Sequence, residues 1–135
     1  MIAGFILFLS MVVLVEFSIA QWRSMWMSVA AMPLSQSLQA ATGIKNDAIG
    51  ADDFERLVST SRQLCPTSRE GSVWMKEVRI YYRAMRGLAS MCEKQMPGLS
   101  AWAKNELVSC SKYAAVVLDQ RINANLAFAA EVRNY

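Results

Sequence analysis

Cysteine is the residue type in this chain best suited to covalent or redox chemistry, and three cysteines occur, at positions 65, 92 and 110. No histidine accompanies them, so no imidazole can activate a serine or cysteine nucleophile or ligate a metal or haem. The cysteines also lack the C-x-x-C spacing of redox and zinc motifs. Ser109 and Ser111 have no neighbouring base, and the paired carboxylates Asp52 and Asp53 mark a helix start. We therefore expect a protein that is not an enzyme and that holds no cofactor and no metal.

Helix geometry indicates that Cys92 and Cys110 do not pair with each other. They lie on opposite arms of a hairpin that turns at Pro97 and Gly98, at unequal distances from the turn. A rise of about 1.5 Å per residue offsets them by roughly 12 Å along the helix axes. A disulfide needs Cα atoms within about 7 Å. We expect both to be buried free thiols, whereas a bridge from Cys65 to either one stays open.

Basic side chains form a stripe on one predicted helix. Lys76, Arg79, Arg83 and Arg86 are spaced i, i+3, i+7 and i+10, which places them on one face. One interpretation is an ordinary solvated helix face. The other is a surface for anionic lipid headgroups or for an acidic patch on a partner protein. Nucleic acid is not an expected partner, because the net charge is only +3 and no aromatic–basic binding motif is present.

Tryptophan and methionine are the candidate partner contacts. The chain has nine methionines and four tryptophans, namely Trp22, Trp26, Trp74 and Trp102. Such side chains are common in adaptable protein interfaces. They are equally suited to a helical core or to the membrane–water interface, and both interpretations stay open.

The first twenty residues have the composition of a membrane-spanning helix. Glu16 is their only charged side chain, and about 20 mostly apolar residues are needed to cross about 30 Å of hydrocarbon. Trp22 and Arg23 follow at once and suit the headgroup level. No basic residue precedes the apolar run, unlike a cleaved secretory signal. We predict a single-pass membrane protein with a transmembrane anchor over residues 1–23.

Glu16 is the unusual residue of this span, because a carboxylate there costs about 2–3 kcal/mol on insertion scales. It lies close enough to the Trp22 end to extend its carboxylate toward the headgroups. The alternative is a partner, which would be an arginine, a lysine or a backbone donor on a neighbouring transmembrane helix. A single-pass chain cannot supply that partner itself, so Glu16 is a candidate contact with another subunit.

Helices are predicted for the rest of the chain, and the fold class is all-α. Residues 24–50 are expected to be an interfacial helix and linker, with a kink at Pro33. Residues 51–135 are expected to be a small antiparallel domain of about three helices, over 52–64, 73–95 and Ser100 to about Arg133. The inner face of the last helix is predicted from its periodicity to be Ala103, Leu107, Cys110, Ala114, Val117, Leu118 and Ile122.

One family resemblance concerns the N-terminal helix. Glu16 is followed seventeen residues later by Pro33, on an apolar helix that continues into a polar one. This looks like the N-terminal helix of type IV pilins, and V-E-F-S at positions 15–18 is similar to pseudopilins of the tight-adherence type. The apolar run, however, lies mostly before Glu16, and Met11 stands where a processing glycine would be. The resemblance implies a filament subunit with Glu16 in its packing interface.

These features together favour a non-catalytic accessory subunit of a multi-subunit membrane complex, with the pilin-like filament subunit as the alternative. The expected partners are other membrane-protein subunits and the lipid bilayer, including anionic headgroups. Arg23, followed by Lys45 and Arg56, places the C-terminal domain on the cytoplasmic side by the positive-inside rule. Three thiols without obvious pairing also suit a reducing compartment.

Overall fold

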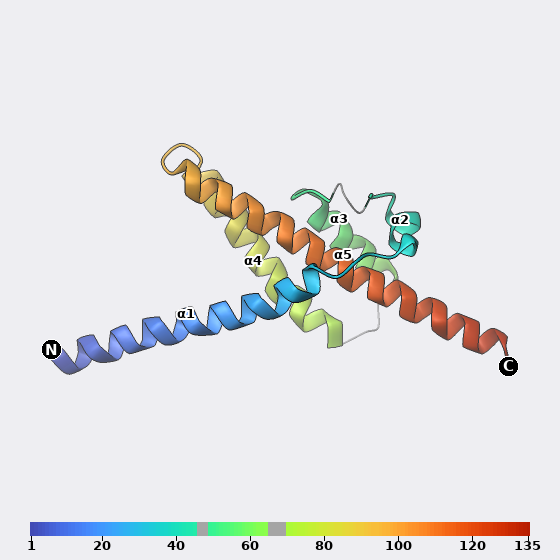
Figure 1. The fold of residues 1–135 in the computed structure, drawn as a ribbon, viewed down its shortest axis with the longest axis horizontal. Helices are drawn as coiled ribbons and strands as arrows, with labels where there is room; N and C mark the ends of the chain where they lie inside the picture. The colour runs from blue at the N-terminus through green and yellow to red at the C-terminus, as the bar shows by residue number, and fades with distance from the viewer. Residues whose placement is uncertain (46–48, 65–69) are drawn as a thin grey trace.

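The computed structural model describes residues 1–45, 49–64 and 70–135, and for residues 70–74 it describes the backbone alone (Figure 1). All regular structure within these residues is helical, which confirms the predicted all-α class. The helices are α1 (Ile2–Ala30), α2 (Gln36–Thr42), α3 (Asp53–Leu64), α4 (Glu70–Cys92) and α5 (Pro97–Arg133).

Helix α5 is the centre of the molecule, because α1, α2, α3 and α4 all pack against it. Figure 1 shows α4 running back along the first half of α5, while the N-terminal half of α1 projects from one side of the molecule and the C-terminal end of α5 from the other. The prediction of a three-helix domain is not confirmed, since α2 and the end of α1 also cover α5. Trp26 and Leu38 are 4% and 1% exposed and belong to the same buried cluster as Phe54 and Leu107. Large apolar side chains in the region that we expected to be a linker account for the difference.

The helix ends differ from their predicted positions for local reasons. Helix α1 continues past residue 23 and stops three residues before Pro33, whose ring would clash with the preceding turn. Helix α5 begins at Pro97 and not at Ser100, because proline in the first turn gives up only an N–H that has no partner there. Ser100 is buried instead, and its hydroxyl donates to the Ala89 carbonyl at 3.1 Å. Gly43 ends α2 with φ at 69°, a conformation that favours glycine.

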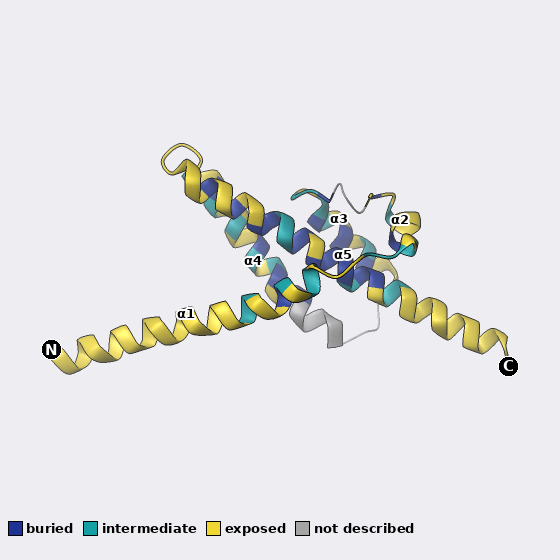
Figure 2. Cartoon of the chain, in the orientation of Figure 1, coloured by how far each residue is buried: buried dark blue, intermediate teal, exposed yellow. Residues whose placement is uncertain are grey.

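Most of the buried residues lie where α3, α4 and the middle of α5 meet (Figure 2), and Trp26 of α1 and Leu38 of α2 join them. The rings of Phe54 and Tyr82 stack with their centroids 4.2 Å apart, and the Tyr82 hydroxyl donates to the Ala51 carbonyl at 2.6 Å. The predicted inner face of α5 is confirmed: five of its residues are buried, and two are partly buried. Cys92 and Cys110 are free thiols, as expected. Only Cys110 is buried as predicted, whereas Cys92 is half-buried because it ends α4 at the exposed turn before Pro97. Cys65 lies outside the described residues.

The N-terminal two thirds of α1 makes no part of this core. Every residue from 1 to 20 is exposed. Among them Phe5, Phe8 and Phe17 each have about two thirds of their surface exposed. At a rise of about 1.5 Å per residue these twenty residues are about 30 Å long. Within the described part of the chain, α1 is the one helix long and apolar enough to cross a membrane.

Candidate functional site where the N-terminal helix meets the helical core

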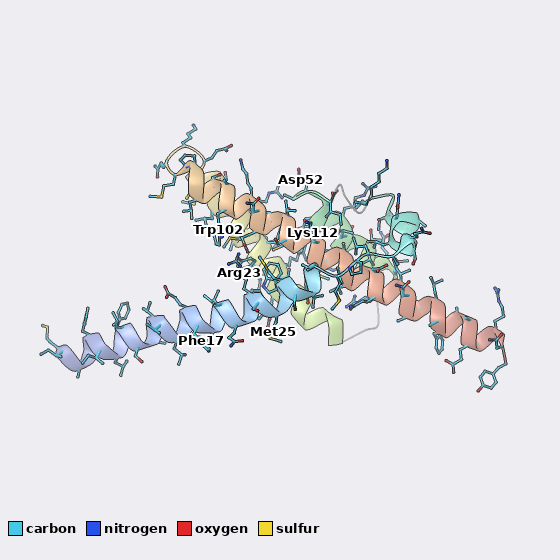
Figure 3. All side chains as sticks on the ribbon, viewed as in Figure 1. Phe17, Arg23, Met25, Asp52, Trp102 and Lys112 are labelled. Atoms are coloured by element: carbon cyan, nitrogen blue, oxygen red, sulfur yellow. The ribbon has the colours of Figure 1, made fainter. Side chains whose placement is uncertain are left out.

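The last two turns of α1 pack against α4 and α5, directly after its exposed apolar stretch. Trp22 and Trp26 are spaced i, i+4 and therefore project from the same face of the helix. Trp26 is buried, and Trp22 and Arg23 are half-buried. Figure 3 shows where Arg23, Met25 and Trp102 lie in this region, with Phe17 farther out along α1. This junction is the candidate functional site.

Four aromatic rings from three helices build the apolar part of the junction. Tyr81 of α4 lies with its ring centroid 5.6 Å from the centroids of both Trp22 and Trp26, edge to face. Tyr113 of α5 lies 6.0 Å from Trp26, also edge to face. Aromatic pairs of this geometry contribute about 0.5–1.5 kcal/mol each beyond the area that they bury. The aromatic contacts therefore fix the direction in which α1 leaves the core.

A buried ion pair completes the junction. Glu106 of α5 is 2% exposed, and Arg23 forms a two-pronged contact with it: Nε donates to Oε2 at 3.1 Å, and Nη2 donates to Oε1. The Tyr81 hydroxyl donates to the same Oε2 atom at 2.9 Å. The Arg23 guanidinium also lies over the Trp102 ring, 5.7 Å from its centroid. One carboxylate thus ties α1 and α4 to α5, and its charge is compensated by a guanidinium held in place by an indole.

Burial keeps the nearby hydroxyl and thiol groups protonated. The pKa of Tyr81 lies well above its usual value, chiefly because the ring is buried and also because Glu106 accepts its hydrogen bond. Burial, with a smaller contribution from Glu106, raises the pKa of the Cys110 thiol to about 12. A thiol of this kind is not a nucleophile near neutral pH, because the thiolate is the reactive form.

Of the five predicted partner contacts, the structure places three at the junction and one, Glu16, away from it. The rings of Trp22 and Trp26 contact each other at the junction, and Trp102, which is 39% exposed, lies against the Arg23 guanidinium. Glu16 lies seven residues before Arg23, about 10 Å away along the helix, and is exposed. Within the described residues its carboxylate has no hydrogen bond or ion pair. The side chain of Trp74 lies outside the described residues.

The basic stripe on α4 is only partly free for a ligand. Lys76, Arg83 and Arg86 are exposed. Arg79 is half-buried, and its guanidinium lies 3.5 Å from the Glu55 carboxylate of α3. Arg79 therefore links two helices of the core, and three basic side chains face solvent.

Two buried carboxylates on α5 were not foreseen from the sequence. One is Glu106, and the other is Asp119, which accepts hydrogen bonds from the backbone N–H of Ser35 at 3.0 Å and from its hydroxyl. Ser35 is the N-cap residue of α2, so Asp119 of α5 holds the residue from which that helix starts. Glu106 and Asp119 each adjoin a core leucine on the inner face of α5. For both residues, a charged side chain next to the apolar face of the predicted helix was the feature that could have indicated burial.

The described residues hold no group of three or more cysteine, aspartate and glutamate side chains that could bind a metal ion. Comparisons with known proteins found no matching family model, no similar curated protein and no similar solved structure.

Proposed function

We propose that this protein is a single-pass, non-catalytic structural subunit of a multi-subunit membrane complex. The observation that supports the proposal most is the division of α1 into two parts. Its first twenty residues are mostly apolar and all exposed, whereas its last two turns are packed against α4 and α5. Exposed apolar side chains over about 30 Å match the thickness of a bilayer. A span fixed to a helical domain holds that domain close to the membrane surface.

Membrane anchoring is tested by alkaline carbonate extraction of membranes that contain the full chain. We expect the protein to remain in the membrane pellet, because its span is integral, and a chain of residues 21–135 to appear in the supernatant. Recovery of the full chain in the supernatant would contradict the anchor.

The partner in the membrane is proposed to contact the span near Glu16. An exposed carboxylate inside hydrocarbon costs about 2–3 kcal/mol, and an arginine, lysine or backbone donor on another helix would offset that cost. A photoreactive amino acid at Val12 or Ile19, one turn to either side of Glu16, tests this contact in intact membranes. Adducts with other membrane proteins support the accessory subunit, and adducts with lipid alone contradict it.

A filament subunit of the pilin-like type makes a different prediction in the same experiment. In that case the adducts would contain only further copies of this chain. The exposed N-terminal stretch of α1 suits side-by-side packing of identical helices as well as packing with other subunits, so the identity of the cross-linked protein decides between the two.

The three exposed basic side chains of α4 are proposed to face the membrane surface or an acidic partner. Lys76, Arg83 and Arg86 lie on α4, whose Tyr81 contacts the end of α1. A basic residue near an anionic surface contributes about 1 kcal/mol. Arg23 follows the span, which favours a cytoplasmic location for the helical domain by the positive-inside rule.

A further inference from the structure

The turn between α4 and α5 carries a cluster of exposed apolar side chains. Met91 lies in the last turn of α4, Met96 is the N-cap residue of α5, and Leu99 and Trp102 lie in the first two turns of α5. All four side chains belong to a stretch of twelve residues, and they are between 37% and 79% exposed. Figure 2 shows the turn itself as exposed. Apolar side chains that gather in one exposed place, and are not scattered singly, indicate a contact surface.

Hydrogen bonds fix the shape of this turn. The backbone N–H of Met96 donates to the Cys92 carbonyl at 2.8 Å and closes the connection between the two helices. The buried Ser100 hydroxyl donates to the Ala89 carbonyl at 3.1 Å and holds the first turn of α5 against α4. The exposure of the apolar cluster is therefore a property of the packed hairpin and not of a loose loop.

The cluster lies on the side of α5 that α1 meets. Leu99, Trp102 and Glu106 are spaced i, i+3 and i+7, so they share one face of α5. Arg23 of α1 binds the Glu106 carboxylate and lies over the Trp102 ring, 5.7 Å from its centroid. Figure 1 shows that the α4–α5 turn and the N-terminal stretch of α1 extend to the same side from this meeting point, whereas the C-terminal end of α5 extends to the other.

The contact with Arg23 gives the depth of the turn relative to a membrane that α1 spans. Arg23 lies three residues after Ala20, where the apolar run ends, and is therefore about 4.5 Å beyond the hydrocarbon. Its side chain leans back toward the span, because Cα–Cβ bonds tilt toward the N-terminus of a helix. Trp102 lies against that side chain, and Pro97 is up to about 7.5 Å farther along α5 toward the turn. The interfacial layer is about 5–8 Å deep, so the turn lies within it.

We propose that the α4–α5 turn is a second membrane contact of this protein, in which Met96, Leu99 and Trp102 insert into the interfacial layer of the bilayer that α1 spans. The inference rests on the membrane anchoring proposed above and goes further in assigning a lipid-binding surface to the helical domain. The charges of the turn agree with it. Glu93 is paired with Lys104 at 3.5 Å, and Lys94 is exposed, so the turn has a net positive charge that suits phosphate headgroups. Two membrane contacts fix the tilt of the domain, which one span alone does not.

Quenching by spin-labelled lipids tests the contact. The full chain, with a fluorescent amino acid in place of Met96, is reconstituted in phosphatidylcholine vesicles that contain a lipid with a nitroxide near the headgroup end of its acyl chain. We expect the nitroxide lipid to remove most of the emission. Leu126 is the matched control, because it is also an exposed apolar residue of α5 and lies about 36 Å past Trp102, toward the other side of the molecule. Emission from position 126 should be unchanged.

A pair of variants separates insertion from mere closeness to the membrane. With the fluorescent residue at position 91, Met96→Asp combined with Leu99→Asp should abolish most of the quenching, because the carboxylates keep the turn out of the apolar edge of the layer. Leu126→Asp combined with Phe128→Asp places the same two charges on exposed positions of the distal end of α5 and should leave quenching at position 91 intact. Circular dichroism of the variants checks that the helices are retained.

Emission at position 96 that is as insensitive to the nitroxide as emission at position 126 would overturn the proposal. The vesicles contain no other protein, so a turn that is covered by a partner protein and not by lipid would give this result. Quenching at position 91 that survives the two aspartates would also overturn it. A fluorescent residue in place of Val13, inside the span, separates this failure from failure of the anchor. Quenching at 13 without quenching at 96 removes only the second contact, whereas the absence of both removes the anchor as well.

Discussion

Replacing Arg23 with methionine is expected to destabilise the helical domain more than neutralising its partner Glu106. The side chain of Glu106 is 3% exposed and that of Arg23 is 36% exposed. Removing one member of a buried ion pair costs about 3–5 kcal/mol, because the other charge stays buried without compensation. Tyr81 still donates to Glu106 in the variant. We therefore expect Arg23→Met to lower the free energy of unfolding by about 3 kcal/mol.

Glu106→Gln leaves a smaller defect, because the amide keeps the volume of the side chain and one oxygen acceptor. It removes the negative charge, and the stranded Arg23 guanidinium can hydrate through its exposed third. A hydrogen bond to a charged group contributes about 1.5–3 kcal/mol, so a loss of about 1.5 kcal/mol is expected. In the double variant neither charge is left alone. Its loss should be smaller than the sum of the single losses, with a coupling energy of about 2 kcal/mol.

The assay is urea unfolding of the full chain in mild detergent, followed by far-UV circular dichroism and by tryptophan emission. Arg83→Met is the matched control, because Arg83 is an exposed arginine of α4. Its effect should stay within about 0.5 kcal/mol. The reasoning fails if Arg23→Met is no more destabilising than Arg83→Met, or if the effects of Arg23→Met and Glu106→Gln simply add.

Four further predictions follow from burial and hydrogen bonding. The pKa values of Tyr81 and Cys110 are raised in the folded state. Their contribution to stability is therefore complete below pH 9.0, the ordinary pKa of a thiol, and is lost as the pH approaches about 12, the folded pKa of Cys110. The melting temperature should fall as the pH rises through that range. At pH 8 the half-buried Cys92 should react with a maleimide well before the buried Cys110, as peptide mass spectrometry would show. Asp119→Ala removes the acceptor of the Ser35 N–H and hydroxyl at the start of α2 and should cost about 1–2 kcal/mol in the same urea assay, with faster hydrogen exchange over residues 35–42. Deleting residues 126–135, which are all exposed, should change the unfolding free energy of the domain by less than about 0.5 kcal/mol, and an unfolded product would show that this end of α5 belongs to the core.

The inner face of α5 was predictable because its pattern repeats over several turns. Ala103, Leu107, Cys110, Ala114 and Leu118 follow the helical period, and the structure buries all of them. A repeat of this length leaves little choice of which side faces the core. The exposed apolar stretch of α1 was predictable for a similar reason, since twenty residues with one charge have a distinctive composition.

The junction was not predictable, because the same residues suit two different environments, the membrane interface and the interior of the protein. Trp22, Arg23 and Trp26 after an apolar run are typical of a membrane interface, and nothing local indicates that they also pack inside the protein. The partner of Arg23 is Glu106, 83 residues later. A charged residue is by default assigned to the surface, and only the packed arrangement shows that Glu106 pairs with Arg23 and that Asp119 accepts hydrogen bonds from Ser35 inside the protein.

The measurement that tests the proposed function most directly is affinity purification of the full chain from native membranes in mild detergent, with quantitative mass spectrometry. Wild-type protein is expected to carry other membrane proteins in fixed, near-integral ratios, and Glu16→Gln to lose some of them while staying in the membrane fraction. Recovery of this chain alone, or only of further copies of itself, would contradict its role as an accessory subunit of a membrane complex.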